Sequence, residues 1–243
     1  MRLMFRICFL LFIFALPLFG QSLWQKAVDI MSNNLNWVPG SMTMQFELLD
    51  KNGEADMVNE STYKVYLDDN GEVRSELVRM LNDGKDVTAE EKEKRDKERA
   101  KADEKKDSKD QNAEFSMTDS PFHPDNQATI ELKPMDEEKS IDGQMCRRFD
   151  YTLPLEENTR TGTVWLNIKT GAPVLHEFAT DPLPPRVKEM QNTVHFEHTP
   201  EGNFYSTKAV FKGVGGILFI KKSFRGTMTF AEHWQHDKSD DED

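Results

Sequence analysis

The sequence predicts an α+β fold, mostly antiparallel β, in which a curved half-barrel sheet is covered on its concave side by helix. Two observations carry this prediction: most of the chain alternates apolar and polar residues with a period of two, and tight turn signals separate the alternating segments. A third observation is one amphipathic segment with helical spacing, placed ahead of the strands. With 243 residues, the chain is long enough for one domain with a sizeable core.

The first 20 residues, MRLMFRICFLLFIFALPLFG, have the features of an export signal. Two arginines accompany an apolar run over residues 7–16, and Pro17 and Gly20 follow it. Because this run is short for a bilayer span, we expect cleavage after Gly20, with an uncleaved N-terminal anchor as the alternative. This leader predicts a periplasmic or secreted protein.

Cysteine usage supports an exported chain that is stabilised by its core alone. Cleavage after Gly20 removes Cys8 and leaves Cys146 as the single cysteine, so no intramolecular disulfide can form. The mature chain would begin with Gln21 and has no N-terminal cysteine to carry acyl chains. We therefore expect no lipid anchor.

A helix is predicted over residues 22–38, which precede the first strand. Apolar residues recur there at spacings of three and four, and Pro39-Gly40 is a stop signal. The period then changes to two over residues 41–48. Asn52-Gly53 and Asn70-Gly71 are turn signals, so residues 41–81 predict a three-stranded meander.

Later strands are predicted over residues 129–132, 144–153, 161–169, 173–180, 193–198, 203–212 and 217–230. Glycine-containing turns separate them, including Gly215-Gly216. Residues 21–236 are thus expected to form one domain, and residues 237–243 a disordered acidic tail.

Residues 86–110 interrupt the strand pattern with 10 acidic and 9 basic side chains. Thr88-Ala89-Glu90-Glu91 matches a capping box, and opposite charges recur at four-residue spacing. We expect a solvated helix that protrudes from the domain and frays towards Ser108. A partner-docking element is the alternative.

One alternating set in several strands is large, apolar and flexible, and this set is the candidate ligand-binding lining. Methionine and phenylalanine form a soft surface that can accommodate an acyl chain or a peptide. Ordinary core packing is the alternative, and it is the commoner role of such side chains. The candidate lining is Met42, Met44, Phe46, Leu48, Met145, Phe149, Tyr151, Val164, Leu166, Ile168, Phe224, Met228 and Phe230.

The layout of leader, N-terminal helix, meander beginning SMTMQFELLD, inserted helix and the later segment TGTVWLNIKTGAPVLHEF resembles the outer membrane lipoprotein-sorting family, the LolA/LolB-like carriers. Residues 162–177 are the most characteristic stretch. The resemblance implies a half-barrel whose covering helices enclose an apolar cavity.

Motifs for catalysis or metal binding are weak. His195/His198 and His233/His236 are His-x-x-His pairs, but residues three apart on a strand point to opposite faces, so we expect surface histidines and no metal. Cys146 is expected to be inert, and we expect neither enzymatic activity nor a cofactor. The net charge of −12 disfavours nucleic-acid binding.

Two functions follow from these features. The first is a monomeric, non-enzymatic carrier or sensor for a lipid, an acyl chain or a lipidated protein. The second is a structural or regulatory envelope protein that uses the same fold to bind a protein partner, with residues 86–110 as a docking element.

Overall fold

The computed structural model describes residues 15–34, 37–68, 73–105, 119–199, 204–217 and 220–235. Several predictions lie outside these residues: most of the leader, the Asn70-Gly71 turn, the end of the charged insertion, His236 and the acidic tail. In the described part, the chain is mostly antiparallel β with two α-helices, as predicted.

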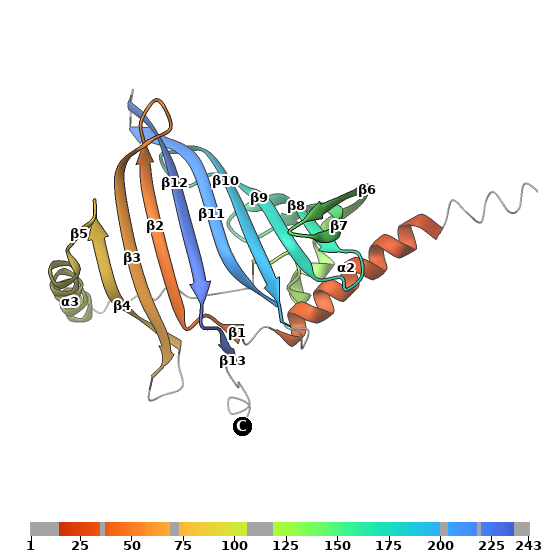
Figure 1. Ribbon diagram of the computed structural model, residues 1–243, viewed down its shortest axis with the longest axis horizontal. Coiled ribbons are helices and arrows are strands. Elements are labelled where there is room, and N and C mark those ends of the chain that lie inside the picture. The colour runs from red at the N-terminus through yellow and green to blue at the C-terminus, as the bar shows by residue number, and fades with distance from the viewer. Residues whose placement is uncertain are drawn as a thin grey trace, which may run out of the picture. The chain divides into compact units, whose positions relative to one another are not determined.

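Eleven strands form one open sheet in the order β5-β4-β3-β2-β12-β11-β10-β9-β8-β7-β6. Their bounds are β2 Ser41–Leu49, β3 Ala55–Leu67, β4 Val73–Asn82, β5 Lys85–Asp86, β6 Glu131–Ile141, β7 Gln144–Pro154, β8 Thr159–Asn167, β9 Pro173–Asp181, β10 Val187–His198, β11 Phe204–Ile217 and β12 Ile220–Ala231. The predicted meander is confirmed, because β2, β3 and β4 pair in sequence order (Figure 1).

The chain divides into two compact units. The first unit comprises residues 1–35, 117–182 and 195–205, and the second comprises residues 36–116, 183–194 and 206–243. Each unit is described by itself below.

The N-terminal helix α2 spans Ala15–Asn33, so the predicted bounds of 22–38 were wrong at both ends. It ends where the Asn34 side chain donates to the Ile30 carbonyl at 2.6 Å, and the Asn34 N–H donates to the Met31 carbonyl. Residues Trp37–Val38 are strand β1, which pairs with β13, Trp234–Gln235. A local side-chain bond therefore stops this helix before the Pro39-Gly40 signal.

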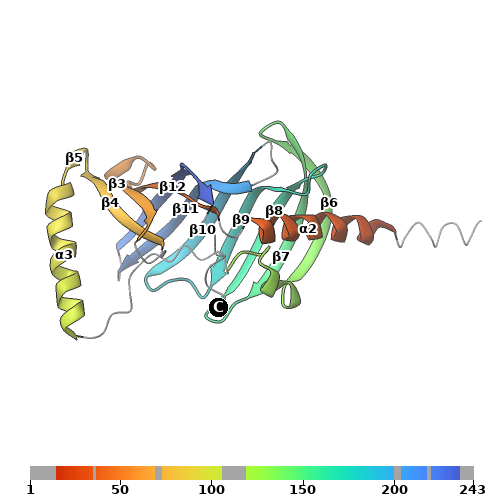
Figure 2. The same ribbon diagram turned by 90° about the horizontal axis from the view of Figure 1, so that it is seen from below.

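In the first unit, α2 lies against β6 and β8 (Figure 2). It packs there through a stripe of buried side chains. Trp24, Ala27, Val28 and Met31 carry this stripe, each no more than 5% exposed, at the spacing of one helix face. Gly171, at φ +83°, lets the β8–β9 turn approach the helix, because a Cβ there would lie 2.5 Å from the Lys26 Cβ.

In the second unit, the charged helix α3 spans Thr88–Lys105, as predicted. It does not simply protrude, because it lies against β4 at the end of the sheet (Figure 1). The predicted capping box is also wrong. Thr88 Oγ1 accepts from the Met80 N–H at 2.8 Å, and Asp86 accepts from the Thr88 N–H.

Candidate functional site

The second unit brings two of the predicted apolar sets together on one face of β2 and β12. Opposite residues in an antiparallel pair share a face, and Met42 lies opposite Phe230, Met44 opposite Met228 and Leu48 opposite Phe224. We call these six residues, with Phe46, the Met/Phe face. Phe230 is 7% exposed and the other six side chains are half-buried.

Phe211, which the sequence prediction missed, adds a fourth phenylalanine ring to the Met/Phe face. Its centroid lies 6.5 Å from that of Phe46 and 6.3 Å from that of Phe224, and Phe46 and Phe224 are stacked at 6.0 Å. Phe211 lies opposite Gly226, and a Cβ on Gly226 would lie 1.8 Å from the Phe211 Cζ. The ring therefore lies down against the glycine backbone, which gives this part of the face a flat aromatic floor.

The register of β11 and β12 explains why Phe211 was missed. Gly215 and Gly216, taken as a turn from sequence, lie inside β11, opposite Lys222 and Lys221. With the strands paired out to Ile217 and Ile220, Phe211 falls opposite Gly226. The pairing of Phe211 with Gly226 could have marked Phe211 as part of this face. That pairing can be read from the sequence only when the turn between β11 and β12 is placed correctly.

The opposite face of the same strands is polar. Thr43 and Thr62 hydroxyls lie 3.3 Å apart, and the Gln45 amide donates to Glu47 at 3.1 Å. Arg225 forms an ion pair with Glu47, which raises the pKa of the guanidinium and leaves the Glu47 residue only 8% exposed. The large apolar side chains of these two strands are therefore concentrated on the Met/Phe face.

The predicted lining residues of the first unit lie in a filled core. Phe149, Val164 and Leu166 are 0% exposed and Tyr151 is 2% exposed. The Trp24 ring of α2 packs 5.8 Å from Phe149 and 4.9 Å from Phe122, which is also fully buried. Met145, by contrast, is 44% exposed, and Ile168 is half-buried just beyond β8.

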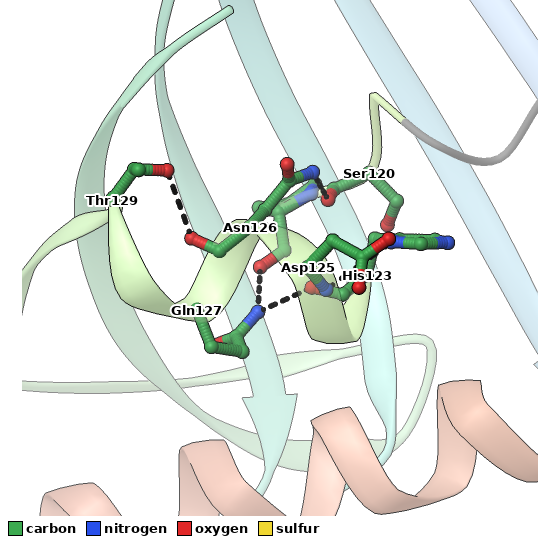
Figure 3. Close-up of polar contacts among 7 residues, drawn as sticks. Ser120, His123, Asp125, Asn126, Gln127 and Thr129 are labelled. Atoms are coloured by element: carbon green, nitrogen blue, oxygen red, sulfur yellow. Dashed lines mark hydrogen bonds and ion pairs between the residues drawn. The ribbon is translucent and has the colours of Figure 1, made fainter.

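The short 3₁₀ helix η1 (Pro124–Ala128) connects the loop over this core to helix α2. The Gln127 amide nitrogen donates to the Pro121 and His123 carbonyls, both at 2.9 Å (Figure 3). Its oxygen accepts from the Trp24 indole N–H at 2.9 Å. One side chain thus ties the loop that carries Phe122 to helix α2.

His176 of β9 is the most strongly perturbed titratable group in this core. Burial lowers its pKa to about 3 and raises the pKa of Tyr151, and Arg160 lowers both to a smaller extent. The Tyr151 hydroxyl and His176 Nε2 lie 2.7 Å apart, and the imidazole stacks on Phe178 at 4.7 Å. Both groups are neutral at physiological pH, so the pair is a buried structural hydrogen bond.

A pocket of about 530 Å³ lies on the polar side of β6, β7 and β8. Lys133, Asp150 and Thr163 are cross-strand neighbours in it. Burial opposes ionisation of Asp150, but hydrogen bonds from Arg148 and Thr163 hold its pKa below the usual range. The full lining is Glu131, Leu132, Lys133, Arg148, Asp150, Tyr151, Thr152, Thr161, Gly162 and Thr163.

The histidines and the cysteine singled out from sequence do not converge in the described residues. His198 Nε2 lies 3.2 Å from the Pro173 carbonyl, and His233 Nε2 lies 3.1 Å from the Ser206 carbonyl. Cys146 is fully buried beside Trp165, and burial raises the pKa of its thiol. Over the described ranges, no three His, Cys, Asp or Glu side chains gather in a metal-binding group.

Among the described helices, none has the length and apolar character needed to cross a membrane. No protein-family model matches the chain, and the search of curated proteins returned no match.

Solved structures show weak likeness. A DUF1329 family protein from Desulfovibrio piger matches with 8% identity and a TM-score of 0.36, over 90% of this chain and 94% of that one. MucB in complex with MucA(peri) matches with 10% identity and a TM-score of 0.23, over 90% and 99%. The MucA/MucB complex of Pseudomonas aeruginosa matches with 8% identity and the same TM-score and coverage. These likenesses do not assign the chain to a family.

Proposed function

We propose that this chain is an exported, non-enzymatic carrier that binds a lipid, an acyl chain or a lipidated protein on its Met/Phe face, in the manner expected of an outer membrane lipoprotein-sorting-like protein. The observation that carries the proposal is the half-buried state of six large, flexible apolar side chains on one face of β2 and β12. Thioether and phenyl groups adapt to an irregular alkyl chain, and none of these side chains can act as a nucleophile or a general base.

The leader supports the exported part of this proposal, because its arginines and short apolar run are typical of a cleaved signal. The aromatic floor supports the binding part. Phe211 and Phe224 lie against Gly226 and Gly213, which keeps the floor low enough for a ligand to lie across it.

The test is the lipid content of the protein after expression with its own leader. Native mass spectrometry and lipid extraction should recover bound lipid from the wild-type chain. Met44→Glu places a charge on the Met/Phe face and should abolish this recovery. Thr43→Glu is the matched control, because it adds the same charge one residue away on the polar face. A wild-type protein without lipid, or equal loss in both variants, would refute the proposal.

A protein partner is the second candidate function, and a different observation favours it. Tyr66, Leu67 and Val73 are 39%, 41% and 36% exposed at the end of the β3–β4 hairpin, with Leu67 directly opposite Val73. Leu67 and Val73 therefore share one face as an exposed apolar pair, and exposed apolar patches are typical of protein contacts. A lipid-free protein that recovers a stoichiometric partner, and loses it in Leu67→Asp, would support this function.

A further inference from the structure

Strand β4 lies at one end of the described part of the sheet, and most of its outer edge has no strand beside it. Its outer neighbour β5 pairs only with Leu81 and Asn82. Helix α3 lies beside this strand (Figure 1), and it contacts β4 at Met80 and Glu76. An edge strand with unpaired backbone groups is a template for pairing with another chain.

The junction between β5 and α3 already occupies part of this edge as a strand would. The Val87 N–H donates to the Met80 carbonyl at 2.9 Å, and the Met80 N–H donates to Thr88 Oγ1 at 2.8 Å. Further along, Lys92 Nζ lies 3.1 Å from Glu76 Oε1. The Arg95 guanidinium donates to the Tyr63 hydroxyl at 3.0 Å and lies over the Tyr63 ring.

These contacts are polar and none of them is fully buried, so α3 is held weakly. The only apolar residues in its sequence, TAEEKEKRDKERAKADEK, are three alanines. The Lys92 and Glu76 side chains are 43% and 59% exposed, and exposed ion pairs contribute little to stability. A helix without an apolar stripe can leave the edge without exposing an apolar face of its own.

The β4 sequence is complementary to itself. If Ser75 of one chain faces Ser75 of a second copy in an antiparallel pair, Arg74 lies opposite Glu76, and Val73 lies opposite Leu77. Both contacts occur twice about the two-fold axis, which is the arrangement of a closed dimer. Opposite charges and apolar pairs at directly facing positions stabilise a strand pair.

We propose that the β4 edge is a pairing site for a second copy of this chain, and that α3 is a displaceable guard that blocks it. Lys92 of α3 holds Glu76 in the single chain, in the way that Arg74 of the second copy does in the dimer. Arg74 bonds Asp68 at 2.9 Å, and a guanidinium with five N–H donors can serve Asp68 and the new Glu76 together. This inference does not rest on the proposed lipid-binding function.

The test replaces residues 88–105 with a flexible Gly/Ser linker of the same 18 residues, which removes the guard and keeps the chain connection. Light scattering coupled to gel filtration then reports the mass. We expect the wild-type chain at the mass of one chain and the linker variant at twice that mass. A linker variant that stays at one-chain mass, or that assembles beyond two chains, would overturn the proposal.

The register is tested by charge reversal in the linker variant. Glu76→Arg places arginine opposite arginine and should return the mass to one chain. Adding Arg74→Glu restores opposite charges and should double the mass again. A dimer that is indifferent to Glu76→Arg would overturn the proposed pairing.

The full-length double variant Lys92→Glu/Arg95→Glu tests the guard without replacing the helix. Lys92→Glu places a carboxylate beside Glu76, and Arg95→Glu removes the cation from Tyr63. Weakening the guard should shift the mass towards two chains as the protein concentration rises. A variant that stays at one-chain mass across the concentration series would count against the guard, even if the linker variant fails to fold.

Discussion

The apolar sheet face of β7 and β8 and the Met/Phe face of β2 and β12 are built from the same kind of alternating sequence, yet they reach different states. Phe149 on β7 is 0% exposed under Trp24 and beside the loop that carries Phe122. Phe46 on β2 is half-buried among the rings of Phe211 and Phe224. Strand period therefore decides which side chains share a face, and the segments packed on that face decide whether it is core or surface.

The largest expected effect comes from shortening a side chain in the buried core of β7 and β8. Phe149→Ala removes a fully buried ring and should lower the free energy of unfolding by about 3 to 5 kcal/mol. Phe46→Ala removes a ring that is already half-exposed and should cost about 1 to 2 kcal/mol. Urea unfolding followed by tryptophan fluorescence measures both. Equal costs would mean that the two faces do not differ as described.

A pH titration of stability probes the burial of the filled face through His176. Its pKa falls from 6.5 in the unfolded chain to about 3 in the fold, so the unfolded state binds the proton first as pH falls. The stabilisation is complete above pH 6.5 and is lost as pH falls towards 3. Between pH 7 and pH 5 the loss should be about 2 kcal/mol.

His176→Gln is the control for this titration, because glutamine keeps a polar group near Tyr151 and does not titrate. The difference between wild type and variant isolates the histidine from the acidic residues, which titrate at lower pH. A wild-type curve parallel to that of the variant would show that His176 is accessible to protons in the fold.

The flat floor of the Met/Phe face is tested at Gly226. In Gly226→Ala, the new Cβ would lie 1.8 Å from the Phe211 Cζ, so the ring must lift from the backbone. Because Phe211 is half-buried and can move, the cost in stability should be about 1 to 3 kcal/mol. The amount of lipid recovered with the Gly226→Ala variant should also be lower than with the wild-type chain.

Phe211→Leu in the Gly226→Ala background gives the matching rescue. The smaller side chain removes the overlap, so stability should recover in part, and a double-mutant cycle measures the coupling between the two positions. Independent, additive effects would contradict the packing of this ring on this glycine.

The sequence was sufficient for the elements whose signals are local. Alternation over residues 41–48 predicted β2, and charge spacing predicted α3. The segments that pack on the buried face of β7 and β8 were not predictable in this way, because their placement depends on contacts between residues far apart in the sequence. Trp24 and Gln127 are 103 positions apart, and no periodicity relates them. His176 gave no motif either, since its low pKa comes from burial by the fold.

The smallest expected effect is at α3, where the covering segment makes polar contacts in place of an apolar core. Lys92→Ala removes an ion pair whose side chains are 43% and 59% exposed, and it should change the free energy of unfolding by less than about 1 kcal/mol. Arg95→Ala should cost somewhat more, because Arg95 also bonds Glu91 and lies over the Tyr63 ring. Urea midpoints at low and high salt separate the two, since salt screens only the ionic part. A loss as large as that of Phe149→Ala would show that α3 supports the core of its unit, and that it is not a weakly held cover.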